Sequence, residues 1–101
     1  MVDTFLALAN PVRRELLSLL RSGPRTAGEL AEEFDLSRPS VAEHLSVLRQ
    51  AGLVESEKSG RHSNYHLTPE PLAEIGEWLH PFEKHWRTRL RALAEVAEED
   101  S

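Results

Sequence analysis

Apolar residues recur along most of this chain at spacings of three and four, the period of amphipathic helices. Asn10-Pro11 has the pattern of an N-cap followed by proline at the first helical position, and Gly23-Pro24 closes the same segment. A shorter apolar segment, residues 5–9, predicts one more helix before it. The stripe of the longer segment consists of Val12, Leu16, Leu19 and Leu20.

Two further short helices are predicted next, separated by a turn of only a few residues. Thr26 and Glu29 have the spacing of a capping box, which predicts that a helix begins there. Ser37 predicts the N-cap of another helix, which ends before Gly52. The inward positions are Leu30 and Phe34 in the first of these helices and Val41, Leu45 and Leu48 in the second.

The period changes after Gly52 to that of short extended segments. Residues 53–58 and 63–67 predict two strands. Residues 59–62, Ser-Gly-Arg-His, predict the basic tip of the hairpin that joins them.

Helical spacing returns after residues 68–71, Thr-Pro-Glu-Pro, and continues toward the end of the chain. Pro81 is expected to kink this last helix or split it in two. The chain therefore predicts a mainly α fold with a β-hairpin wing, a winged helix-turn-helix in the order helix, helix, helix, helix, hairpin, helix. The apolar positions of the last helix are Leu72, Ile75, Leu79, Phe82, Trp86, Leu90, Leu93 and Ala97.

The composition narrows the class of protein. A length of 101 residues fits one domain, so residues 1–101 are expected to form a single winged helix-turn-helix unit. The absence of cysteine excludes disulfides, thiol catalysis and thiolate metal sites. Asp3 stands where a secretory signal would carry positive charge, and the aliphatic cluster 16–20 is too short to span a bilayer. We therefore expect a cytoplasmic protein without a membrane partner.

The formal net charge of −5 argues at first against a nucleic-acid partner. The charge is unevenly distributed, however. Residues 37–69 carry four basic and three acidic side chains, a balance of +1, and they include His44, His62 and His66. A DNA-binding surface must therefore be local to this middle third, and non-specific affinity should be weak at physiological salt.

Two short helices joined by a tight turn and followed by a basic-tipped hairpin suit duplex DNA, because the second helix can enter the major groove. There Arg38 can fork onto a guanine, Glu43 can accept from a cytosine amino group, and Ser40 can serve either role. The Ser37 hydroxyl and the helix N-terminus suit a phosphate oxygen. The predicted DNA-binding residues are Ser37, Arg38, Ser40, Glu43 and His44 on the helix and Lys58, Arg61 and His62 on the hairpin.

The apolar stripe of the last helix is too long for three short helices to cover. We therefore expect the first and last helices to form a homodimer interface. A two-fold dimer would set two recognition helices about 34 Å apart on a palindromic operator. The predicted interface residues are Phe5, Leu72, Ile75, Leu79, Phe82, Trp86, Leu90 and Leu93.

A resemblance to a known family rests on residues 7–14 (Ala-Leu-Ala-Asn-Pro-Val-Arg-Arg), 28–31, 36–41, 44–54 and 60–61. Together these segments resemble the arsenical-resistance repressor (ArsR/SmtB) family over nearly the whole chain. The Trp-Leu-His-Pro-Phe run that starts at Trp78 is similar to the metal-independent branch. The resemblance implies a dimeric winged-helix protein that represses genes, often including its own.

One departure from the family pattern concerns the recognition helix. Members commonly have serine followed by lysine or arginine before the helix's histidine, and this chain has Ala42 and Glu43. A carboxylate in place of a cation implies a different operator preference, not a loss of DNA binding.

The family's metal ligands do not carry over to this chain. Among the positions of this chain that match the family's metal ligands, only His85 could coordinate a metal, so no metal and no cofactor are expected. A different site that combines His80, Glu83 and His85 stays open. The matching positions are Thr26, Gly28, Pro69, Pro71, Phe82 and His85.

Alternative roles are weighed against DNA binding. No glycine-rich phosphate loop, paired metal-binding histidines or nucleophile elbow occurs, so an enzyme is not expected. Ser37 could simply cap its helix, and Arg38 could simply be solvated. Arg13 and Arg14 are expected to be solvated on the second helix, with phosphate contact as an alternative. A winged-helix module that binds only protein is favoured by the acidic net charge and disfavoured by the basic wing tip.

Overall fold

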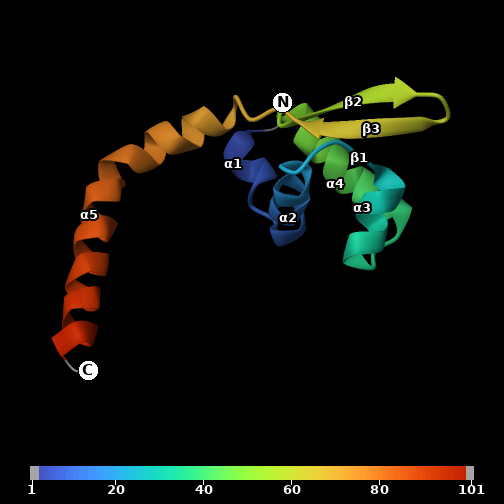
Figure 1. Cartoon of the computed structure of the whole chain (residues 1–101). Helices are drawn as coiled ribbons and strands as arrows, with labels where there is room; N and C mark the ends of the chain where they lie inside the picture. The colour runs from blue at the N-terminus through green and yellow to red at the C-terminus, as the bar shows by residue number, and fades with distance from the viewer. Residues whose placement is uncertain (1–2, 100–101) are drawn as a thin grey trace.

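The computed structural model describes residues 3–99, and these form helices and one small antiparallel sheet (Figure 1). Most of the described chain is helical, and a hairpin wing follows the helix pair, so the predicted fold class is confirmed. The elements are α1 (Thr4–Ala7), α2 (Pro11–Leu20), β1 (Arg25–Thr26), α3 (Ala27–Phe34), α4 (Arg38–Gln50), β2 (Val54–Ser59), β3 (His62–Leu67) and α5 (Leu72–Glu99).

The predicted helix starts are confirmed by their caps. Asn10 Oδ1 accepts from the backbone N–H groups of Val12 at 2.8 Å and Arg13 at 3.2 Å. The capping box at Thr26 and Glu29 is complete in both directions, at 3.1 and 3.0 Å. The first helix ends earlier than the expected residues 5–9, because the backbone N–H of Ala9 bonds to the carbonyl of Leu6, three residues back rather than four.

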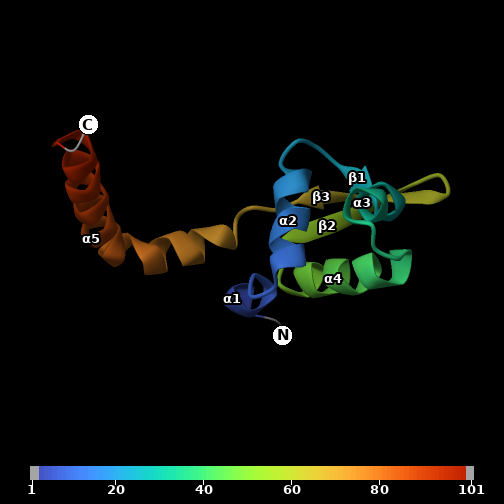
Figure 2. The same cartoon turned by 90° about the horizontal axis from the view of Figure 1, so that it is seen from below.

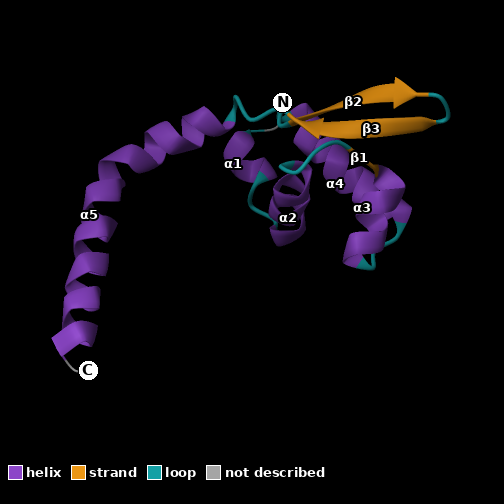
Figure 3. Cartoon of the chain, in the orientation of Figure 1, coloured by secondary structure: helices purple, strands orange, loops and turns teal. Residues whose placement is uncertain are grey.

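The sheet has the order β1-β3-β2. Strands β2 and β3 pair as a hairpin that projects beyond the helices (Figure 3). Its two-residue turn is Gly60-Arg61, and Gly60 has a φ of 62°, a left-handed conformation that glycine adopts at little cost. Strand β1 was not predicted, because two residues that pair with Tyr65 and Asn64 carry no periodicity of their own.

The core lies between the sheet and helices α2, α3 and α4, which stand on one side of it (Figures 1 and 2). Most predicted inward positions are fully buried, and Val12, Leu19 and Phe34 are half-buried around them. The hairpin closes the core with its first residues. The core consists of Ala7, Leu16, Leu17, Leu20, Leu30, Ala31, Val41, Leu45, Leu48, Leu53 and Val54.

Helix α5 leaves this body and makes the molecule elongated (Figures 1 and 2). Its 28 residues span about 42 Å, and the ribbon bends in its first half, in the region that contains Pro81. This matches the expected kink, since proline lacks the N–H that would bond to the preceding turn. The radius of gyration is 17.7 Å, whereas about 13 Å is usual for a compact domain of this size. Among residues 3–99, no helix is long and apolar enough to cross a membrane.

Candidate nucleic-acid interface

Helix α4 buries one side and exposes the other. Val41, Leu45 and Leu48 face the core, so the opposite side of the helix is the surface available to a groove. Glu43 lies on this exposed side, and no described residue forms an ion pair with it. The exposed positions along this outer face are Pro39, Ala42, Glu43, Ser46, Arg49 and Gln50.

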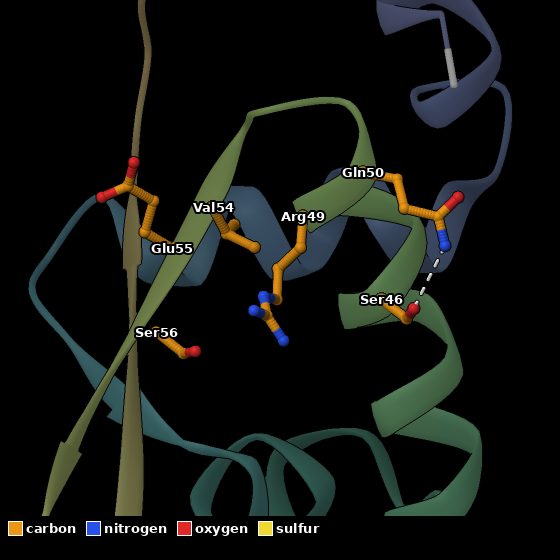
Figure 4. Close-up of a pocket in the computed structure, with 6 residues that line it drawn as sticks. All are labelled: Ser46, Arg49, Gln50, Val54, Glu55 and Ser56. Atoms are coloured by element: carbon orange, nitrogen blue, oxygen red, sulfur yellow. Dashed lines mark hydrogen bonds between the residues drawn. The ribbon is translucent and has the colours of Figure 1, made fainter. Parts of the chain in front are cut away.

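Of these residues only Glu43 was predicted to bind DNA, and the unpredicted polar ones are Ser46, Arg49 and Gln50. They line a hollow between the second half of α4 and the start of β2 (Figure 4). Gln50 Nε2 donates to Ser46 Oγ at 3.4 Å, and the Arg49 side chain extends into the hollow. No carboxylate among residues 3–99 pairs with Arg49. Ser46 lies four residues after Ala42, and Arg49 and Gln50 lie three and four residues after Ser46, so helical spacing could have identified them.

The start of α4 is closed by serine hydroxyls. Ser37 Oγ accepts from the backbone N–H of Ser40 at 3.3 Å and lies 3.0 Å from Ser40 Oγ. The capping role considered for Ser37 is therefore present. Ser40 is half-buried and turned toward this cap rather than centred on the outer face.

Three predicted DNA-binding residues from two elements line one hollow. Arg38 at the start of α4 lines this hollow together with Arg61 and His62 of the wing and the first turn of α3. Gly28 leaves room for the arginine, because a Cβ at this position would lie 3.0 Å from Arg38 Nη2. Lys58 is exposed on β2 and is not one of the lining residues.

Carboxylates moderate the charge of the same hollow. Glu29 and Glu32 line it beside Arg38. The backbone N–H of Thr26 is the largest cause that lowers the pKa of Glu29, followed by the Thr26 hydroxyl and by the charges of Arg25 and His62. Glu29 is therefore ionised at neutral pH, and its charge is engaged by the helix start rather than left free.

His44 lies on the flank of α4 that faces α2. It is half-buried, and its Nδ1 is 3.5 Å from Nη1 of Arg13. The expectation that Arg13 and Arg14 are solvated is met by Arg14, which is exposed, whereas Arg13 is half-buried. Both guanidinium groups donate to carbonyl oxygens at the end of α1, the end of a helix that attracts cations.

The predicted interface residues of α5 lie largely exposed in the single chain. Leu90 and Leu93 are 61% and 66% exposed. Trp78 was not predicted as an interface residue, yet it is 58% exposed and packs edge-on against Phe5 with ring centroids 6.0 Å apart. Leu72 and Ile75 are half-buried at the base of α5. We define the apolar face of α5 as Trp78, Leu79, Phe82, Trp86, Leu90, Leu93 and Val96.

The described side chains do not fit a metal site. No group of three or more histidine, aspartate or glutamate side chains converges anywhere in residues 3–99. His80 Nδ1 lies 3.6 Å from Glu83 Oε2, but Arg87 binds the same carboxylate at Oε1, and His85 does not join them. The family positions Thr26 and Gly28 instead cap α3 and accommodate Arg38.

Comparisons with known proteins agree with this geometry. Residues 10–56 match the family model described as bacterial regulatory protein, arsR family. The chain is 37% identical to transcriptional repressor SdpR of Bacillus subtilis (strain 168), covering 78% of this chain and 88% of that protein. It is 36% identical to the HTH-type transcriptional regulator Rv2034 of Mycobacterium tuberculosis, covering 93% and 85%.

Solved structures of similar proteins share the fold. A structure titled "Possible transcriptional regulator for arsenical resistance" matches with a TM-score of 0.74 and 40% identity, covering 81% of this chain and 85% of that chain. An ArsR-like transcriptional regulator from Rhodococcus sp. RHA1 matches with a TM-score of 0.67 and 34% identity, covering 92% and 88%.

Proposed function

The chain belongs to the ArsR family and is a DNA-binding transcriptional regulator, and from this premise we propose that it represses transcription as a homodimer on a palindromic operator. In this arrangement α4 enters the major groove and the wing contacts the backbone or the adjacent minor groove. The family is made up of regulators rather than enzymes, so the expectation that this chain is not an enzyme is confirmed. We expect the dimer to act in the cytoplasm, without a metal or other cofactor.

The observation that supports DNA binding at this surface is that three side chains from α4 and the wing line one hollow. Arg38, Arg61 and His62 come from α4 and the wing and line the same hollow. The exposed side of α4 that carries Glu43 continues from there. Arg61 at the wing and Arg38 at the start of α4, beside the polar outer face of α4, support an interface in which the wing contacts phosphates and the helix residues select the bases.

The exposed apolar face of α5 supports the proposal that a second copy of the chain binds there. Full burial of a large apolar side chain is worth roughly 1.5–3 kcal/mol, and the side chains of this face, 37–66% exposed, each forgo a corresponding part of it. A two-fold interface is self-complementary, so each copy covers the exposed face of the other and the two α4 helices are paired for a palindrome. Leu90 and Leu93, in the second half of α5, have the largest exposed fractions on this face.

The test is a gel shift on DNA taken from upstream of the protein's own gene, with a scrambled duplex as competitor. We expect the upstream fragment to bind well above the scrambled one. Arg38→Ala should lose about 1–3 kcal/mol on the upstream fragment and flatten the sequence preference, because a bidentate base contact is removed.

Two outcomes would count against this assignment. Equal affinity of the wild-type protein for upstream and scrambled DNA at several salt concentrations would contradict operator recognition. Unchanged affinities for Arg38→Ala on both duplexes would show that Arg38 does not read a base, while leaving operator binding in place.

A further inference from the structure

Arg13 lies where α1, α2 and α4 meet. Its Nε donates to the carbonyl oxygen of Ala7 at 2.6 Å, and its Nη2 donates to that of Leu6 at 3.1 Å. The third nitrogen, Nη1, is 3.5 Å from Nδ1 of His44 on α4. One planar guanidinium therefore uses all three of its nitrogens on two different elements.

The residue type suits this position for a physical reason. Helix α1 has only four residues, so its last carbonyls lack a following helical turn to bond with. Arginine distributes five donors over three nitrogens of a rigid fork and can so reach acceptors on two elements, whereas lysine has all three of its donors on one nitrogen. Because a guanidinium only donates, Nδ1 of His44 must be the acceptor in this contact.

The other side of α1 contacts α5. Phe5 packs edge-on against Trp78, which belongs to the apolar face of α5. A continuous series of contacts therefore runs from Trp78 through Phe5 and the end of α1 to Arg13, and from Arg13 to His44 on α4. It joins the face proposed for the second copy to the helix proposed for the major groove.

We infer that Arg13 is a positioning residue that couples the α1–α5 face to the placement of α4 on DNA, and that His44 acts as its contact on α4 rather than as a base-reading residue. This inference rests on the proposed function. It follows from the geometry, because α1 and α4 share the guanidinium and a shift of either helix must break or stretch one of its contacts.

Arg14 provides a matched control. Its Nη1 donates to the carbonyl of Leu8 at 2.7 Å, so it also binds the end of α1. None of its hydrogen bonds within residues 3–99 reaches α4. Loss of Arg14 therefore removes a similar anchor of α1 and leaves the contact to the recognition helix in place.

The experiment is a double-mutant cycle on operator affinity, measured by fluorescence anisotropy at fixed salt, with sedimentation confirming the dimer at the concentrations used. Arg13→Ala and His44→Ala should each weaken binding about fivefold to tenfold, and Arg14→Ala less than about twofold. The double variant Arg13→Ala/His44→Ala should bind at most about twofold more weakly than the weaker of the two single variants. The reason is that each single change already removes the same contact.

A conservative variant separates the positioning role from direct DNA contact. In His44→Asn the amide oxygen occupies roughly the place of Nδ1 and can accept from Arg13, but the far ring nitrogen is gone. We expect this variant to retain most of the wild-type affinity. If Arg13→Ala does not fold, the comparison of His44→Asn with His44→Ala carries the test alone.

Three results would overturn the inference: losses that multiply in the double variant, an Arg14→Ala defect as large as that of Arg13→Ala, or a His44→Asn protein as weak as His44→Ala. Each is distinct from failure of the proposed function, which would show as equal wild-type affinity for operator and scrambled DNA.

Discussion

At the scale of single residues, arginines with the same charge occupy different chemical positions in this molecule. Arg13 is turned inward and donates to carbonyls of α1, while Arg49 extends into an open hollow beside β2. Arg38 and Arg61 come from separate parts of the chain and line the same hollow. A count of charges cannot make these distinctions, and for that reason the acidic net charge of the whole chain says little about DNA binding.

Arg61 offers a prediction that concerns phosphate contact alone. It is exposed at the wing tip beside Gly60, so it can reach a phosphate without touching a base edge. Arg61→Ala should weaken binding to all sequences by a similar factor and reduce the slope of log affinity against log salt by about one unit, because one fewer counterion is released. Titrations at several salt concentrations measure this slope.

Arg21, which is exposed and caps the end of α2, is the control for Arg61. Arg21→Ala changes the net charge equally but lies outside the hollow at the wing. A slope that falls equally in both variants would mean that net charge, and not a contact of Arg61, sets the salt dependence.

At the scale of elements, the sequence predicted what local chemistry determines. The N-caps Asn10, Thr26 and Ser37 bond within three residues of themselves, so their helices could be located from the sequence. Strand β1 could not, because it exists only by pairing with β3. The position of Arg38 beside the wing and the orientation of His44 toward α2 also depend on packing between elements, which spacing along the chain does not specify.

The capping box of α3 leads to a prediction of pH dependence. The folded state lowers the pKa of Glu29, chiefly through the backbone N–H of Thr26. A lowered pKa means that the carboxylate stabilises the fold above its unfolded pKa, and that this stability is lost as the pH falls through the folded pKa. Glu29→Gln, which keeps an acceptor but not the charge, should therefore be less stable than wild type at pH 7.

The difference in stability between Glu29→Gln and wild type should shrink as the pH falls below 4.5, the ordinary pKa of the carboxyl, and vanish once the pH passes the lowered pKa of the folded state. Urea midpoints across this range measure it, with Glu32→Gln, an exposed change on the same helix, as the control. A gap that stays constant with pH would mean that the charge of Glu29 contributes nothing to the start of α3.

At the scale of the whole molecule, the shape of one chain indicates that a partner covers its last helix. The extents of 59 × 31 × 20 Å describe a small body with a long projecting helix. The apolar side chains of that helix lie on one side of it, as the three- and four-residue spacing predicted, and no element of the described chain covers its far half. A continuous wet apolar surface of this kind is typical of an interaction site.

Leu90→Glu tests whether a second copy covers this surface. The change places a charge at a position that is 61% exposed in one chain, so the isolated chain should tolerate it. Burial of an unpaired carboxylate at an interface is costly, however, so the dimer should dissociate and operator affinity should fall severely.

Thr88→Glu is the matched control, because Thr88 is exposed and points to the opposite side of α5. Sedimentation should find Leu90→Glu as a folded monomer and Thr88→Glu as a dimer with its operator affinity retained. A wild-type protein that sediments as a monomer at micromolar concentration and still binds its operator tightly would mean that recognition does not depend on the apolar face of α5.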